Sequence, residues 1–233
     1  MTTYLWNPPA TPSLPVRGKI ERLPVHRLFF IGRNYHAHAI EMGSPVDKAA
    51  ARAFYFTKSY HALVESGATV PYPPETQNYH FEMELVIVIG KAGFRITQEL
   101  AHEHIYGYAS GLDMTRRDLQ AVARKQGHPW DMAKDVENGA VCSEVVPMSG
   151  VVLEQGEISL SVNGASKQHA DINQMVWSIR EIIADLSLYY HLQPGDLIYT
   201  GTPEGVGAVL PGDKIVGQVQ GVGTVTLHIG AAE

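Results

Sequence analysis

The sequence has only one cysteine, and its apolar residues never form a long uninterrupted run. Cys142 alone excludes an intrachain disulfide and suits a reducing compartment, and we interpret it as a small core residue rather than a nucleophile. No apolar run approaches membrane-spanning length. Residues 1–20 hold four prolines and no apolar signal region, so we expect no secretory signal and a cytoplasmic protein.

Basic charge and nucleotide-binding motifs are also scarce. The chain has 18 Lys and Arg against 24 Asp and Glu, and its formal net charge of −6 argues against a nucleic-acid partner. The sequence has no G-x-x-x-x-G-K-[ST] loop, and no G-x-G-x-x-G follows an expected strand. These absences argue against a nucleotide-binding protein and a Rossmann-type dehydrogenase.

Glycine and proline are plentiful, with 22 and 14 residues, which favours turns and many short strands. The 233 residues, 45% of them hydrophobic, suffice for one large domain with a single core. The early prolines predict an extended arm over residues 1–24, in which Tyr4 and Trp6 pack on the body or on another subunit. A single catalytic domain is expected over residues 25–233.

A buried strand is expected over residues 81–90, where apolar and β-branched residues end at a glycine. Alternate residues of a strand share a face, so Glu82 and Glu84 lie together on a face that continues as valine. Two adjacent buried carboxylates repel each other unless a cation such as Mg²⁺ neutralises them. From this stretch alone, a metal site and a pair of solvated glutamates are equally good interpretations.

Four further side chains are candidates on local grounds. His38 and Glu41 are three residues apart in an expected helix over residues 36–43, where the carboxylate can orient the imidazole as a general base. Taken alone, an exposed surface pair explains that spacing better. Asp113 closes an apolar strand and is either a third oxygen ligand or a helix cap. Lys134, taken alone, is best interpreted as a solvated surface lysine.

Three local patterns predict regular structure elsewhere. Asn163-Gly164 is a strong hairpin-turn signal. The apolar spacing over residues 171–191 predicts one long amphipathic helix. A further helix is expected to begin at Thr97 and to run to about residue 104.

Together these stretches resemble the fumarylacetoacetate hydrolase family. The resemblance is carried by Gly32-Arg33-Asn34-Tyr35 with His38 and Glu41, Glu82-Met83-Glu84, an Asp-x-Thr-x-Arg-Asp-x-Gln string from Asp113, Lys134, and Gly201-Thr202-Pro203-x-Gly205-Val206-Gly207. Order and spacing match from about residue 25 to the end. Each piece is weak alone, but the joint match is specific.

The resemblance implies an α+β, β-rich fold, namely a mixed β-roll with a few peripheral helices, usually assembled as a homodimer. It also implies a bound Mg²⁺ or Mn²⁺. The family's metal ligands map to Glu82, Glu84 and Asp113. The dyad of the family's lid maps to His38 and Glu41. The contacts to the oxo-acid end of the substrate map to Arg33, Gln120, Thr202 and Lys134.

The implied activity is metal-dependent hydrolysis of a carbon–carbon bond in a 2,4-diketo acid. The pattern most resembles family members that cleave fumarylpyruvate to fumarate and pyruvate in aromatic degradation. Oxaloacetate decarboxylation, other acylpyruvate hydrolysis and isomerisation stay open within the family. From another class, a non-enzymatic metal-binding β-roll is the alternative, but mere binding needs no base such as the His38–Glu41 pair.

The expected chemistry assigns His38, oriented by Glu41, to deprotonate a water that attacks the distal carbonyl, while Lys134 balances negative charge. Residues 33–53 are expected to order over bound substrate, which slower amide exchange with oxalate plus Mg²⁺ would reveal. The candidates for holding a distal carboxylate are Lys58, Arg116 and Arg117.

Overall fold

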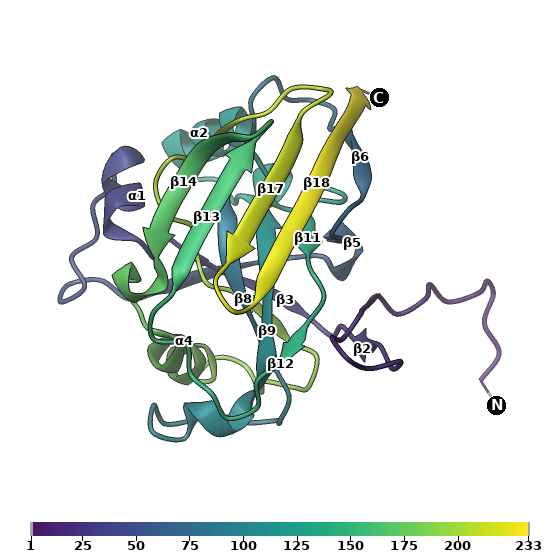
Figure 1. Cartoon of the computed structure of the whole chain (residues 1–233), viewed down its shortest axis with the longest axis vertical. Helices are drawn as coiled ribbons and strands as arrows, with labels where there is room; N and C mark the ends of the chain where they lie inside the picture. Colours follow the sequence, from purple (N-terminus) through teal and green to yellow (C-terminus); the bar gives the residue numbers. More distant parts are fainter. Residues whose placement is uncertain (1, 233) are drawn as a thin grey trace.

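A computed structural model describes residues 2–232, and most of its regular structure is β-strand (Figure 1). The strands are β1 (Ser13–Leu14), β2 (Leu23–Pro24), β3 (Leu28–Gly32), β4 (Phe54–Lys58), β5 (Leu63–Glu65), β6 (Thr69–Tyr72), β7 (Tyr79–Phe81), β8 (Met83–Ile89), β9 (Ile105–Asp113), β10 (Thr115–Arg116), β11 (Ala140–Cys142), β12 (Val146–Pro147), β13 (Glu157–Val162), β14 (Ala165–Asp171), β15 (Leu197–Tyr199), β16 (Gly207–Ala208), β17 (Lys214–Val219) and β18 (Gly223–Ala232). The helices are α1 (His36–Glu41), α2 (Arg117–Gln126), α3 (Asp131–Lys134) and α4 (Ile179–Leu186), with 3₁₀ turns at Tyr60–Ala62, Ala101–His104 and Ile172–Gln174.

Two sheets pack face to face and form the body of the fold. The larger sheet has the order β4-β3-β15-β8-β9-β11-β5, with β12 paired to β9, and the smaller one has the order β14-β13-β17-β18-β6. Both sheets are mixed, because β3 runs parallel to β15, β5 to β11 and β6 to β18. Figure 1 shows the smaller sheet in front of β8, β9 and β3. The expected β-rich α+β fold with few helices is confirmed.

Strand β8 is buried on both faces and divides the core in two. One set of alternating residues packs between the sheets, namely Met83, Leu85, Ile87 and Ile89. The other set, Val86 and Val88, joins a second cluster with residues of β3, β15 and the N-terminal segment. The sheets approach so closely that a Cβ on Gly217 would lie 2.3 Å from the Met83 sulfur. The two-residue alternation expected for this strand is confirmed.

The N-terminal segment joins the fold through a short hairpin. Ser13 pairs with Pro24, and both Leu14 and Val16 are buried in the second core cluster. Before this hairpin the chain is extended and exposed, and Tyr4 and Trp6 keep 67% and 77% of their surface. The body thus does not cover these two aromatic rings, and the boundary at residue 25 stays a prediction.

The long helix expected over residues 171–191 is wrong in extent, since α4 covers only Ile179–Leu186. The reason is that Asn34 binds the preceding backbone. Its carbonyl accepts from the Val176 N–H and its side-chain oxygen from the Trp177 N–H, which holds this segment out of a helix. Helix α4 then begins at Ser178 with a capping box to Glu181.

Two of the other local expectations are confirmed and one is wrong. The hairpin β13–β14 turns at Asn163-Gly164, and α1 lies within the expected range. The helix expected from Thr97 is a turn followed by the 3₁₀ helix Ala101–His104, because the Thr97 carbonyl bonds only to the Leu100 N–H three residues on. Among residues 2–232, no helix has the length and apolarity needed to cross a membrane.

Candidate active site

The antiparallel pairing of β8 with β9 brings three carboxylates to one edge of the large sheet. Glu84 faces Gly111 across the pair, and the Asp113 N–H donates to the Glu82 carbonyl at 2.9 Å. All three side chains are buried, and each offers an oxygen within 4.8 Å of the others. The start of β8 and the end of β9 therefore lie side by side, and the three expected metal ligands come together there.

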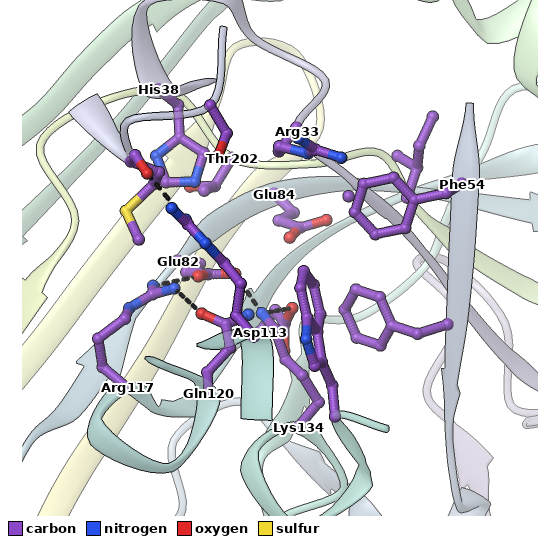
Figure 2. A pocket seen from close by; sticks show the side chains of 17 residues that line it. Arg33, His38, Phe54, Glu82, Glu84, Asp113, Arg117, Gln120, Lys134 and Thr202 are labelled. Atoms are coloured by element: carbon purple, nitrogen blue, oxygen red, sulfur yellow. Dashed lines mark hydrogen bonds and ion pairs between the residues drawn. The ribbon is translucent and has the colours of Figure 1, made fainter. Parts of the chain in front are cut away.

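Three cations surround this triad, as Figure 2 shows in part. Lys134 Nζ lies 2.7 Å from Glu82 Oε2 and 2.6 Å from Asp113 Oδ2, and Lys58 Nζ lies 2.7 Å from Asp113 Oδ1. Arg117 makes an ion pair with the other oxygen of Glu82. Both lysines are almost fully buried, so the interpretation of Lys134 as a surface lysine is excluded.

The pKa values of the three carboxyl groups are not shifted in the same direction. Burial disfavours the charged form of Glu82, but Lys134 and Arg117 outweigh it and hold the Glu82 pKa well below its usual range. Burial likewise opposes the charge of Lys134, yet Asp113 and Glu82 outweigh it and raise the Lys134 pKa. These two groups form a charged pair.

Glu84 differs because no basic side chain among residues 2–232 pairs with it. Its Oε2 accepts the Gly201 N–H at 2.6 Å, and Gly201 adopts a φ of +88°, which favours glycine at this turn. Burial, followed by the charges of Asp113 and Glu82, raises the Glu84 pKa well above its usual value. Without a further cation, Glu84 therefore holds a proton more readily than an ordinary glutamate does.

The donor set fits a hard divalent ion. All three donors are carboxylates, and Asp113 Oδ1 receives no well-directed hydrogen bond although Lys58 lies close by. Carboxylate oxygens are the ligands that Mg²⁺ and Mn²⁺ accept. A divalent ion there would also supply the positive charge that Glu84 lacks.

His38 approaches the cavity from α1. Its Nδ1 lies 3.1 Å from Glu41 Oε2, and the other Glu41 oxygen accepts the Gly205 N–H at 3.1 Å. The His38 side chain is buried and lines the cavity, while Glu41 lies behind it and is about one-third exposed. The carboxylate thus holds one imidazole nitrogen, and the ring faces the carboxylate triad across the cavity.

The cavity has a volume of about 270 Å³ and gathers most of the expected site residues. It is lined by eight of the nine, namely Arg33, His38, Glu82, Glu84, Asp113, Gln120, Lys134 and Thr202. The ninth, Glu41, contacts it through His38. Aromatic rings of Phe54, Phe56 and Trp130 form one wall. A small organic acid with an apolar portion fits this lining.

Several residues of the site were not assigned from the sequence. Gln168 of β14 accepts the Met83 N–H and donates to Thr202 Oγ1 at 2.8 Å, which fixes the Thr202 hydroxyl. Arg124 lines the cavity, and its spacing from Gln120 on α2 was a usable signal. Lys58 and Arg117 were expected at a distal carboxylate, but they pair with the triad instead.

Comparisons with known proteins agree with this site. A family model described as fumarylacetoacetate (FAA) hydrolase C-terminal matches residues 27–229. The chain is 67% identical over 192 residues to the fumarylpyruvate hydrolase of Ralstonia sp, covering 82% of this chain and all of the relative. It is 36% identical over 204 residues to a mitochondrial oxaloacetate tautomerase of Arabidopsis thaliana, covering 87% of this chain and 90% of the relative.

A solved structure extends the likeness to the whole fold. The fumarylpyruvate hydrolase of Pseudomonas aeruginosa, in complex with Mn²⁺ and pyruvate, superposes with a TM-score of 0.93 at 43% identity. The match covers 98% of this chain and all of that chain. The fold, the motifs and the family model lead to one assignment: the chain belongs to the fumarylacetoacetate hydrolase family.

Proposed function

We propose that this protein hydrolyses fumarylpyruvate to fumarate and pyruvate, with Mg²⁺ or Mn²⁺ held by Glu82, Glu84 and Asp113. The observation that carries the proposal is one cavity that joins this triad to a carboxylate-oriented His38. The fumarylpyruvate hydrolase of Ralstonia is much more similar to this chain than the oxaloacetate tautomerase of Arabidopsis. Hydrolysis of fumarylpyruvate is therefore favoured over oxaloacetate chemistry.

The chain's own residues supply the proton transfers. A divalent ion on the triad would polarise the keto oxygens of the substrate as a Lewis acid. His38, held by Glu41, removes a proton from a water molecule. The resulting hydroxide adds to the carbonyl carbon of the fumaryl group, which becomes a carboxylate of fumarate, and the bond from this carbon to the methylene carbon breaks. The methylene carbon keeps the electron pair and takes the proton from His38, which gives pyruvate.

The remaining site residues bind and orient the substrate. We assign the oxo-acid end to Arg33, Gln120, Thr202 and Lys134. Gln120 accepts from Arg117 through Oε1, which leaves its amide N–H groups free to donate. Lys134, held by Glu82 and Asp113, adds positive charge beside the triad. The aromatic wall supports the apolar carbons between the two carboxylates of the substrate.

We also infer a homodimer in the cytoplasm. The exposed Tyr4 and Trp6 of the extended N-terminal segment give an apolar surface that a second copy would cover. Light scattering on the full chain and on a Tyr4→Ser/Trp6→Ser variant tests this. A monomeric wild type would contradict the proposed homodimer. A variant that is still dimeric would show that Tyr4 and Trp6 do not contribute to the interface.

The substrate assignment is tested by a direct comparison of three acids. The Mn²⁺-loaded protein is given fumarylpyruvate, acetylpyruvate and oxaloacetate at equal concentrations, and products are identified by chromatography. We expect the highest kcat/KM for fumarylpyruvate. Carbon dioxide from oxaloacetate, with no loss of fumarylpyruvate, would keep the site but move the function to decarboxylation.

A further inference from the structure

The second carboxylate of the proposed substrate needs a cation, and the three expected candidates are already engaged. Lys58 is buried and donates to the Met114 and Gly139 carbonyls beside Asp113. Arg117 pairs with Glu82 at the triad. Arg116 donates to the Met132 carbonyl at 3.0 Å and does not line the cavity. Another basic side chain must hold the distal group.

Arg124 is in the right place on α2. Arg117, Gln120 and Arg124 follow one another at steps of three and four residues, so one helix face carries all three toward the cavity. Figure 2 shows Arg117 and Gln120 beside Glu82 on this face. Arg124 lies one turn farther along, is exposed, and pairs with no carboxylate among residues 2–232. Its charge is therefore available to an anion.

The separation of Gln120 and Arg124 along the helix is comparable with, and slightly shorter than, the separation of the two substrate carboxylates. Gln120 and Arg124 are about 6 Å apart along the axis, at 1.5 Å per residue. The two carboxylates of extended fumarylpyruvate are roughly 7–8 Å apart, since carbon–carbon bonds measure about 1.5 Å. We propose that Arg124 binds the distal carboxylate and selects substrates that carry one. This inference rests on the proposed function.

Arg124 also connects this carboxylate to the helix that bears His38. Its Nη1 donates to the carbonyl of Met42, the C-cap residue that follows α1, at 2.9 Å. A guanidinium offers five N–H donors, so it can keep this bond and still bind a carboxylate with the others. A substrate with a distal carboxylate thus fixes the position of α1, whereas a shorter acylpyruvate does not.

Arg33 is the other cavity cation that pairs with no carboxylate in the part of the chain described. Its guanidinium packs on the Phe54 ring at 4.8 Å, and its Nε is buried without a hydrogen bond. This packing holds the guanidinium beside Phe54 of β4. Arg33 thus stays assigned to the oxo-acid end, and the two arginines have separable effects.

The test measures kcat/KM for fumarylpyruvate and for acetylpyruvate, which lacks the distal carboxylate, in the Mn²⁺-loaded full chain. Arg124→Gln is expected to lose about 10- to 100-fold on fumarylpyruvate and less than about 2-fold on acetylpyruvate. Arg124→Lys is expected to recover part of the loss. Lys125→Gln, one residue on and outside the cavity, is the matched control and is expected to leave both values unchanged.

Each other outcome overturns a stated part of the account. An equal loss on both substrates in Arg124→Gln, or no loss on either, overturns the role of Arg124. If kcat/KM for fumarylpyruvate alone falls in Arg33→Gln and not in Arg124→Gln, Arg33 binds the distal carboxylate. That result also overturns the role of Arg124. A wild type that turns over acetylpyruvate but not fumarylpyruvate overturns the proposed function, and this inference with it.

Discussion

The Nδ1 atom of His38 lies 3.1 Å from the Glu41 carboxylate, one turn further along α1. A carboxylate can only accept a hydrogen bond, so Nδ1 carries the proton and Nε2 is left as the basic nitrogen. Glu41 also accepts the Gly205 N–H from the loop that bears Thr202. The dyad therefore couples the orientation of the base to a second wall of the cavity.

His38→Ala is expected to lower kcat by about 10²- to 10⁴-fold, because the base that activates water is lost. Mn²⁺ affinity, measured by calorimetry, is expected to stay unchanged, since His38 is not a proposed ligand. His36→Ala changes an exposed histidine of the same helix and serves as the control. Retained turnover in His38→Ala would exclude His38 as the base, whereas a wild type without turnover would support the non-enzymatic binding alternative.

Lys134→Met is expected to destabilise the metal-free protein by about 3–5 kcal/mol, because the buried Glu82 carboxylate loses the cation that most favours its charged form. Urea denaturation in EDTA measures the change. The matched control is Lys91→Met, which breaks an exposed pair with Glu103 and is expected to cost far less stability. Equal losses in the two variants would mean that the triad does not need the lysine charge.

Metal binding is expected to release a proton from Glu84. The Glu84 pKa is raised well above its usual value, so without the ion the side chain holds a proton more readily than an ordinary glutamate, whereas a metal ligand must be ionised. Calorimetric titration with Mn²⁺ in buffers of different ionisation enthalpy counts the protons released. Glu84→Gln is expected to release fewer protons and to bind the ion more weakly. Equal proton release by wild type and variant would exclude Glu84 as the source.

His80 is expected to make stability fall in acid. Burial, and next the charge of Arg117, lower the His80 pKa to about 4 from 6.5. Between these pH values the unfolded chain binds a proton that the folded protein does not, so stability rises with pH across this window and falls as the pH is lowered. The free energy of unfolding is expected to change by roughly 1–2 kcal/mol across this window. Solvent screening of the partly exposed His80 keeps the change this small.

Urea denaturation at pH 7 and pH 4.5 separates this contribution from that of the carboxylates. His80→Gln is expected to lose less stability than the wild type between the two pH values. The exposed His128→Gln is the control and should behave as the wild type does. A pH dependence shared by all three proteins would exclude His80 as the cause.

Local patterns in the sequence predicted the elements that depend on short-range order. The two-residue period over residues 81–90 placed Glu84 of β8 on one face with Glu82, which lies just before β8, and a three-residue step placed Glu41 beside His38. Lys134 was misjudged from local pattern, because its burial depends on carboxylates 21 and 52 residues away. The family resemblance supplied what the local pattern could not.

Long-range packing explains the other differences. Lys58 of β4 pairs with Asp113 of β9, although three other strands lie between them in the sheet, and no local window of the sequence contains such a contact. The long helix expected near α4 is interrupted because Asn34, far away in sequence, binds the backbone of Val176 and Trp177. The spacing of Arg124 from Gln120 places both on one helix face in the sequence, but only the structure shows that this face lines the cavity.

The most direct test of the central claim is the product stoichiometry from fumarylpyruvate before and after removal of the metal. Proton NMR follows fumarate and pyruvate in the Mn²⁺-loaded protein, after EDTA treatment, and after Mn²⁺ is restored. The account predicts fumarate and pyruvate in equal amounts, loss of turnover in EDTA and its return with Mn²⁺. Turnover that persists in the metal-free protein, or pyruvate formed without fumarate, would contradict it.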